Sequence, residues 1–324
     1  MKKCAIFLIA ICCSHLLFAQ DVNAPAEKIN VQPSLSFTMD NAKKIADSKK
    51  FIASNETFKN SALKDFGAAD HLKNTTTISP YKTSLLGDGL AIAGAVGVTF
   101  LGYELISNKN NLTPGELAAK TKDKLPFFDR FVAGNYSPQA DRDSYILFDA
   151  DYALPFIAAL IDKDQRAKFG QVAVLYIETI AITGSMYTLA AGLVYRSRPF
   201  VYGDKAPMAK RLDKGAQRSF YGGHVAGTAA SLFFISKVYH DFHPGSKVTP
   251  YLYVASGALT GLMAYMRMQA GYHFFSDCLL SSVIGTATGL IIPQIHKNKN
   301  LTNVSITPEM FNNGASGLAL TYRF

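Results

Sequence analysis

Arg267, His273 and Asp277 are the residues whose types and spacing best suit chemistry. His273 and Asp277 are four positions apart, so on a helix they share one face. A carboxylate placed there accepts the proton of one ring nitrogen and leaves the other nitrogen free to attack. Arg267 lies six residues before His273, beyond a turn at Gly271, and offers a planar fork for phosphate oxygens. This spacing predicts covalent phosphoryl transfer without a metal, although a histidine that only packs at a helix end would also fit it.

Two upstream clusters favour the chemical interpretation. Arg196-Ser-Arg198-Pro199 closes a long apolar segment, and Ser219-Phe-Tyr-Gly-Gly-His224 opens another. The order and spacing of the three clusters resemble the type 2 phosphatidic acid phosphatase (PAP2) superfamily, which also contains bacterial class A acid phosphatases and vanadium haloperoxidases. The resemblance covers about residues 85–295. The matching positions are Arg198, Pro199, Gly223, His224, Arg267, His273 and Asp277.

The sequence departs from the family pattern at four positions. Ala191 stands where the first motif has a lysine, Tyr221 and Gly222 replace proline and serine of the second, and Met266 replaces the serine of the third. Ala191 removes a cation and Gly222 removes a hydroxyl, so we expect slow turnover unless neighbouring groups compensate. Arg196 is one candidate for that compensation.

The resemblance implies a role for each matching residue. His273 attacks phosphorus and forms a phosphohistidine, while Asp277 orients it. His224 protonates the leaving alkoxide and then activates water. The phosphate-binding groups are Arg198, Arg267 and the backbone N–H of Gly223. No metal and no other cofactor is expected.

Two other functions fit the same resemblance. A vanadium haloperoxidase would hold vanadate on His273, and a non-catalytic membrane protein with this fold would explain Ala191 and Gly222. For a phosphatase the partner is a phosphorylated lipid or a small phosphate ester, and the residues do not choose between them. They do not predict an oligomeric state either.

The charge of the chain suits an anionic partner. Lys and Arg total 33 against 24 Asp and Glu, a net charge of +9 over 324 residues. This balance suits anionic lipid surfaces or phosphate substrates, although cationic solubility explains it equally well. No helix-turn-helix, zinc-finger or aromatic-basic RNA motif is present, so no nucleic-acid partner is expected.

The N-terminus has the pattern of a secretory signal peptide over residues 1–20. Lys2 and Lys3 precede an apolar run that ends near Ala19. Three of the four cysteines fall inside this segment and only Cys278 remains, so no internal disulfide is expected. The sequence therefore predicts an exported protein of the cell envelope.

The rest of the chain divides into three regions. A polar extension over 21–84 precedes the phosphatase domain over 85–297, and a tail over 298–324 follows. Six apolar segments lie in the middle region, near 89–106, 146–161, 169–195, 224–240, 250–266 and 277–295. Their length and lack of alternation predict helices, so the fold class is an all-α bundle of about six helices. Glu178 inside this bundle would need a partner.

We expect the bundle to be embedded in a membrane, with a soluble periplasmic bundle as the alternative. In an up-and-down bundle, Arg198, His224, Arg267 and His273 with Asp277 all lie at helix ends on the same side. A site facing the periplasm requires one segment not to span, and 146–161, with two aspartates, is the candidate.

The C-terminal tail has the pattern of a strand. Apolar and other residues alternate from Leu318 to Phe324 after an Asn312-Asn313-Gly314 turn, which predicts a small β appendage.

Overall fold

The computed structural model describes residues 79–298, 304–310 and 316–322. The predicted signal peptide (1–20), the polar extension before residue 79 and the Asn312-Asn313-Gly314 turn lie outside these described residues. The long helices are α3 (Leu85–Ser107), α5 (Pro138–Ile161), α7 (Phe169–Leu193), α9 (Gly223–Phe242), α10 (Thr249–Gln269) and α11 (Phe275–Ile295). The short helices are α4 (Pro114–Ala118), η2 (Lys122–Lys124), α6 (Lys163–Ala167), η3 (Pro199–Tyr202), α8 (Met208–Leu212) and η4 (Lys214–Gln217).

The six long helices coincide with the six predicted apolar segments, so the predicted helical bundle is confirmed. The largest difference is at α5, which begins at Pro138, well before the apolar stretch. The Ser137 side chain caps this helix by accepting a hydrogen bond from the Ala140 N–H at 3.2 Å. Pro138 occupies the first turn, where its missing N–H costs nothing. Local capping therefore extends the helix beyond the hydrophobic pattern.

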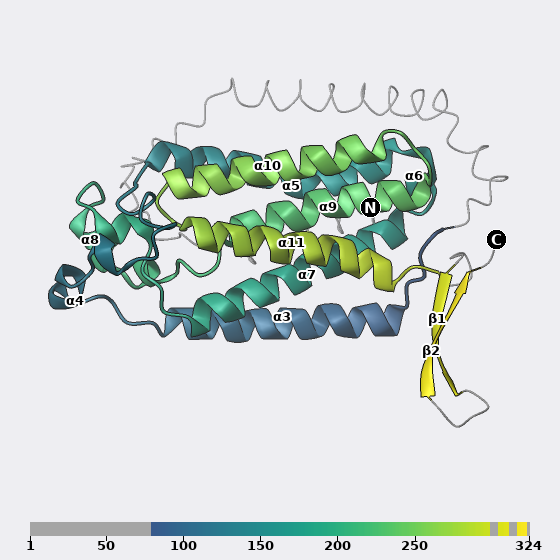
Figure 1. The fold of residues 1–324 in the computed structure, drawn as a ribbon, viewed down its shortest axis with the longest axis horizontal. Coiled ribbons are helices and arrows are strands. Elements are labelled where there is room, and N and C mark those ends of the chain that lie inside the picture. The colour runs from purple at the N-terminus through teal and green to yellow at the C-terminus, as the bar shows by residue number, and fades with distance from the viewer. Residues whose placement is uncertain (1–78, 299–303, 311–315, 323–324) are drawn as a thin grey trace, which may run out of the picture. The chain divides into compact units, whose positions relative to one another are not determined.

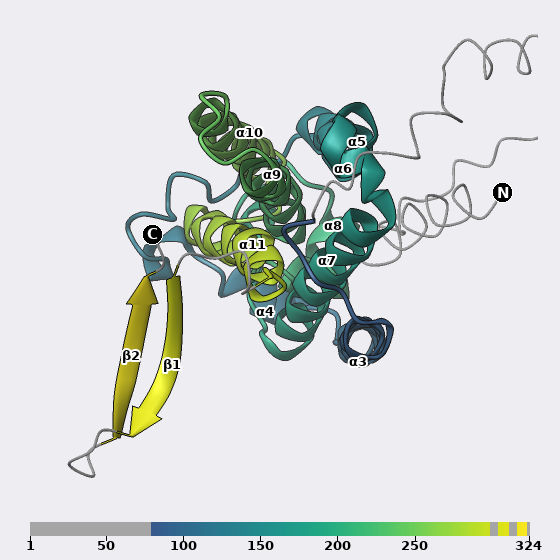
Figure 2. The same cartoon turned by 90° about the vertical axis from the view of Figure 1, so that its right-hand side faces the viewer.

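Helix α9 is the centre of the bundle, with α5, α7, α10 and α11 packed around it (Figure 2). Four of its small apolar side chains are completely buried: Val225, Ala226, Ala229 and Ala230. Helix α11 approaches α9 so closely that the Ala226 carbonyl lies where a β-carbon on Gly285 would be. This close packing fixes the start of α11 relative to the start of α9.

The outer faces of the bundle are apolar. Helix α3 packs mainly on α7 (Figure 2). Large apolar side chains are exposed on α3, α5, α10 and α11, among them Leu90, Phe100, Ile146, Val254 and Val283. Exposed apolar surface of this extent is typical of a protein that contacts lipid.

Within the described residues, four helices are long and apolar enough to cross a membrane: α3, α5, α7 and α11. Helix α5 contains the segment 146–161, which the sequence suggested as the one that does not span. Its 24 residues exceed the number needed to cross the hydrocarbon core, because the cap at Ser137 lengthens it.

At the end where α11 stops, a buried ionic network joins three parts of the chain. Asp241 accepts hydrogen bonds from Tyr81 at 2.7 Å and from Lys297 at 2.8 Å, and it also pairs with Lys237. The Lys82 N–H donates to the His296 carbonyl at 2.8 Å. The segment before α3 is therefore attached to the end of α11.

The predicted strand near the C-terminus is present as β2 (Ser316–Tyr322), which pairs antiparallel with β1 (Val304–Met310). Val304 lies opposite Tyr322, and Met310 lies opposite Ser316.

Candidate active site

The predicted site residues lie at the end of the bundle where α7 and α10 stop and α9 and α11 start (Figure 1). Arg198 follows α7, His224 is the second residue of α9, and Arg267 is in the last turn of α10. His273 lies in the loop before α11, and Asp277 is in the first turn of that helix. Gly222 lies against His273, since a β-carbon on Gly222 would be 3.4 Å from that ring.

A sharp turn at Gly271 positions the loop that carries His273. Gly271 has φ of +80°, and the Asn135 carbonyl lies where its β-carbon would be. Only glycine fits both constraints. The Gly271 carbonyl also accepts a hydrogen bond from the Phe200 N–H at 3.1 Å, so this turn is connected to the segment after Arg198.

The ring of His273 is held by the backbone rather than by Asp277. Its Nδ1 lies 2.7 Å from the Ser219 carbonyl oxygen, and the residue is 2% exposed. A carbonyl oxygen only accepts, so Nδ1 carries the proton and Nε2 carries the lone pair. Burial, Arg267 and Arg198 together lower the pKa of His273 well below its usual value. The imidazole is therefore neutral and able to act as a nucleophile at neutral pH.

Asp277 has a different direct partner from the one predicted. Its carboxylate pairs with Arg196 and accepts hydrogen bonds from the Ser219 hydroxyl at 2.6 Å and the Phe274 N–H at 2.9 Å. The expected direct bond from Asp277 to His273 is wrong, because the Ser219 carbonyl occupies Nδ1. Asp277 instead positions Ser219, whose carbonyl orients the imidazole.

Arg196 is held in a network of its own. It donates to Asp129 at 2.6 Å and to the Ser276 hydroxyl at 3.0 Å, in addition to its pair with Asp277. Asp129 also accepts from the Ser276 N–H at 3.0 Å. Two carboxylates thus surround the Arg196 charge, so Arg196 is poorly placed to compensate for the lysine absent at position 191.

Tyr272 connects the two predicted phosphate-binding arginines. The guanidiniums of Arg198 and Arg267 each lie 4.3 Å from the centre of its ring. Arg267 also donates to Asp141 at 2.6 Å and to the Ser144 hydroxyl at 2.9 Å, both on α5. Lys210 on α8 donates to the Tyr272 hydroxyl at 2.7 Å. Sequence reasoning did not identify Tyr272, although it directly precedes His273.

His224 is packed between aromatic rings of α5. Its ring centroid is 4.7 Å from that of Tyr145 and 4.5 Å from that of Phe148. Its Nε2 is buried, and no group among the described residues hydrogen-bonds to it. A buried polar atom without a partner is costly, so this nitrogen is suited to a ligand oxygen.

The two glycines before His224 lie close to neighbouring side chains. A β-carbon on Gly223 would lie 2.9 Å from the Tyr187 ring, and one on Gly222 would lie 3.1 Å from the Ser281 hydroxyl. The Gly222 N–H donates to that hydroxyl at 2.7 Å. A side chain at position 222 would therefore pack tightly against Ser281 and His273, and the phosphate-binding role of Gly223 stays a prediction.

Two further buried cations, Arg218 and Lys109, lie at this end of the bundle. Arg218 donates to the Tyr187 hydroxyl at 3.4 Å, one helical turn before Ala191 on the same face of α7. Lys109, 3% exposed, donates to the Val194 carbonyl at 2.7 Å. Burial, Arg218 and Arg198 lower the pKa of Lys109 to about 8. The sequence analysis gave Arg218 no specific role in the site, because it stands outside the matching motif positions.

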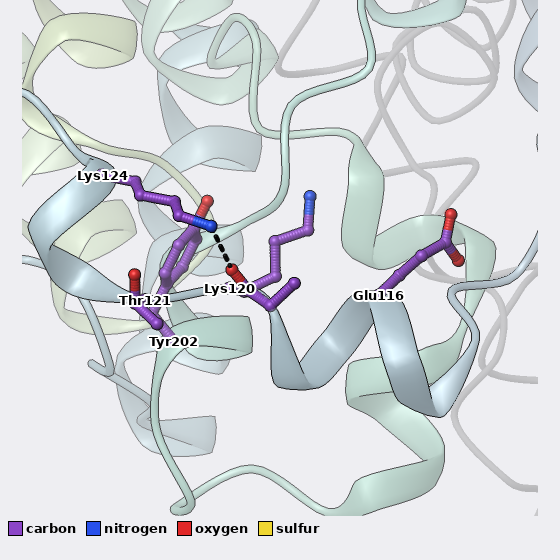
Figure 3. A pocket seen from close by; sticks show the side chains of 6 residues that line it. Glu116, Lys120, Thr121, Lys124 and Tyr202 are labelled. Carbon is purple, nitrogen blue, oxygen red and sulfur yellow. Dashed lines mark hydrogen bonds between the residues drawn. The ribbon is translucent and has the colours of Figure 1, made fainter.

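An open pocket borders the site on the side of α4 (Figure 3). Its lining residues are Glu116, Ala119, Lys120, Thr121, Lys124 and Tyr202. Lys124 donates to the Ala119 carbonyl at 3.3 Å. Tyr202 also packs edge-on against Phe274, with ring centroids 5.8 Å apart. The pocket therefore adjoins the loop that carries His273, but it contains none of the predicted catalytic residues.

Comparison with known proteins finds a family model that matches part of the chain. Residues 172–301 match the family model described as the PAP2 superfamily, a range that includes every predicted site residue. The chain therefore carries a PAP2 superfamily domain, which confirms the resemblance in its motifs. No curated protein matches the chain.

Two solved structures are similar to it. The crystal structure of Aquifex aeolicus LpxE matches 54% of this chain and 99% of its own, with 19% identity and a TM-score of 0.38. The structure of the first transmembrane PAP2 type phosphatidylglycerolphosphate phosphatase from Bacillus subtilis matches 62% of this chain and 94% of its own, with 16% identity and a TM-score of 0.40.

Proposed function

We propose that the protein is a membrane-embedded phosphatase that hydrolyses phosphate monoesters or lipid phosphates and pyrophosphates through a phosphohistidine on His273. The PAP2 superfamily domain supports a phosphatase. The observation that carries the mechanism is the geometry of His273: its Nδ1–H is donated to the Ser219 carbonyl, next to a loop that holds two buried guanidiniums. This arrangement supplies a neutral nucleophile beside groups that bind phosphate oxygens.

In the first half-reaction, the Nε2 lone pair of His273 attacks phosphorus and the bond from phosphorus to the ester oxygen breaks. The negative charge of the bound phosphate favours the imidazolium form of His224, whose Nε2–H protonates the leaving alkoxide. In the second half-reaction the neutral His224 takes a proton from water as the water attacks the phosphohistidine. Arg198 and Arg267 neutralise the equatorial oxygens in both transition states. These charges fill the role that a metal has elsewhere, so the reaction needs no metal.

Arg218 adds a third cation in this proposal. It lies beside α7 one turn from Ala191, near the position at which the family motif has its lysine. A guanidinium here restores the charge that Ala191 lacks, and this role replaces the one considered for Arg196.

The substrate class follows from the surroundings of the site. Four helices are suited to cross a membrane and their outer faces are apolar, so a phosphorylated lipid reaches the site from the bilayer surface. The signal-like N-terminus favours export and a site that faces the periplasm.

The test is a brief incubation of full-length protein in detergent with a substrate carrying labelled phosphate, in the presence of a chelator, followed by a denaturing quench. Wild type should retain acid-labile label and His273→Ala should retain none. His243→Ala, a histidine at the other end of α9, is the matched control and should label like wild type. Labelling of His273→Ala, or activity that disappears in chelator and returns with a divalent cation, would contradict the mechanism.

A further inference from the structure

Three potential metal ligands meet at the end of the bundle opposite the active site. Asp88 is in the first turn of α3, Glu178 is on α7, and His296 directly follows α11. Helix α11 has 21 residues and starts at the active site, so this cluster lies about 30 Å away from it. The cluster is therefore a separate feature, and a ligand bound there is independent of the proposed phosphatase function.

The three ligand atoms are close together and buried. His296 Nε2 lies 3.3 Å from Asp88 Oδ1 and 3.4 Å from Glu178 Oε2, and all three atoms are within 4.8 Å of one another. Asp88 is 6% exposed and Glu178 is 3% exposed. Among residues 79–298, no ion pair joins either carboxylate to a lysine or an arginine. The cluster thus buries two carboxylates with a single imidazole as their neighbour.

The tautomer of His296 aims a lone pair at these carboxylates. Its Nδ1 lies 2.8 Å from the Ile292 carbonyl oxygen, which only accepts, so Nδ1 carries a proton. In the neutral imidazole, Nε2 is then an acceptor that faces two other acceptors. A histidine that ligates a metal generally donates its second ring N–H in this way.

Glu178 provides an independent indication. Its Oε2 is buried and accepts no hydrogen bond from any described residue, although it points toward His296. The second oxygen of Asp88, by contrast, accepts from the Ser84 N–H at 3.0 Å. A buried, ionised carboxylate oxygen without a donor is strongly unfavourable unless a cation or a proton neutralises it.

We propose that Asp88, Glu178 and His296 bind a divalent transition-metal ion, and that Zn²⁺ suits the site best. Zinc bonds to imidazole nitrogen and carboxylate oxygen are about 2.0–2.2 Å long, so two such ligands at a tetrahedral angle are about 3.4 Å apart. The observed separations of 3.3 and 3.4 Å match this value.

A protonated His296 without metal fits less well. Charge-assisted hydrogen bonds from imidazolium to carboxylate are about 2.7–2.9 Å long, shorter than both separations. One imidazolium would also leave a net negative charge buried with two carboxylates, whereas a divalent ion neutralises both. The ion would connect α3, which packs mainly on α7, to α7 and to the end of α11.

The test uses tag-free, full-length protein in detergent. Metal content is measured by mass spectrometry after purification, and Zn²⁺ binding is measured by calorimetry after dialysis against a chelator. We expect about one Zn²⁺ per chain, and a Tm that rises with added Zn²⁺ but not with Mg²⁺, whose preferred ligands are all oxygens.

Glu178→Gln and Asp88→Asn each remove one ligand charge with little change in volume, and each should weaken Zn²⁺ binding by more than about 100-fold. Glu178→Gln also removes a buried charge, so it folds whether or not a metal binds. His243→Ala is the matched control: it removes another histidine–carboxylate pair, to Asp162 at 2.6 Å, and should bind Zn²⁺ like wild type. Wild type that binds no Zn²⁺ after loading, or that binds it no better than Glu178→Gln, overturns the proposal.

Discussion

The two ends of the helical bundle bury opposite excesses of charge. At the active-site end, three arginines and Lys109 are buried, and Asp141 pairs with Arg267. The buried Asp129 and Asp277 both pair with a further cation, Arg196, so positive charge remains in excess. At the other end, Asp88 and Glu178 are buried with His296 as their only partner in an ion pair among the described residues. Both ends place like charges close together in a medium where their repulsion is strong.

The network around Asp241 is a third group of buried charges in the same molecule, and there the chain itself supplies the donors that the carboxylate needs. Asp241 is surrounded by Lys237, Lys297 and the Tyr81 hydroxyl, so its carboxylate has donors enough within the chain. A buried carboxylate that receives enough hydrogen bonds from the chain itself needs no bound cation. The excess of buried positive charge at the active-site end indicates an anionic ligand, and the excess of buried carboxylates at the opposite end indicates a cation.

The largest effect at the active-site end is expected from His224, whose Nε2 has no hydrogen-bond partner among the described residues. His224→Ala should slow hydrolysis of alkyl phosphates by about 10²–10⁴-fold, because it removes the general acid. Nitrophenyl phosphate has a leaving group that needs little protonation, so its turnover should fall far less. Steady-state rates on the two substrates decide the matter, and equal losses would exclude His224 as the acid.

The next largest effect is expected at Arg218. Arg218→Gln should reduce kcat/KM by about 10²–10³-fold, the usual loss when one preorganised donor to a transition state is removed. Adding Ala191→Lys to that variant should recover part of the loss, because the new cation extends from the position that the family motif uses. Kinetics of the single and double variants measure this. If Arg218→Gln is as active as wild type, Arg218 does not replace the missing lysine.

A smaller loss is expected from Arg196, which acts on His273 only through Asp277 and Ser219. Arg196→Gln should lower kcat by about 10-fold with little change in KM, less than the 10²-fold that a displacement of about 1 Å can cost. Arg196→Lys should restore most of the rate. A large rise in KM would instead show that Arg196 contacts the substrate.

The smallest effect concerns pH. Because burial and the arginines lower the pKa of His273 well below 6.5, the nucleophile stays neutral as pH falls through that value. Between about pH 7.5 and 6, this group should therefore change kcat/KM by less than about two-fold. The unfolded chain does take up a proton near 6.5, so this histidine reduces folding stability as pH falls below that point. A pH–rate profile with an acid limb centred near 6.5, shared by His224→Ala, would contradict this expectation.

The six long helices, and the meeting of the site residues at one end of the bundle, could be predicted from the sequence. Long apolar segments predicted all six helices, and the placement of Arg198, His224 and Arg267 at segment ends predicted that they meet. These features follow from local periodicity and from the alternating direction of neighbouring helices.

The choice of partners was not predictable in the same way. A spacing of four between His273 and Asp277 allows a direct hydrogen bond, but the Ser219 carbonyl occupies the Nδ1 of His273. The position of that carbonyl depends on the fold of the loop before α9. Glu178 was expected to need a partner, yet nothing local in the sequence pointed to Asp88 and His296. Those contacts exist only because α3, α7 and the end of α11 lie together.

The placement of Tyr272 has a consequence for the speed of the full reaction cycle. Two guanidiniums each lie 4.3 Å from its ring centre, beside the proposed nucleophile His273. Hydrolysis would end with inorganic phosphate between those same cations. When the phosphate leaves, the two guanidiniums again repel each other without an anion between them, which makes its release unfavourable. If the proposed mechanism holds, we expect phosphate to leave slowly and to compete with incoming substrate, so that for esters that cleave easily phosphate release sets the overall rate.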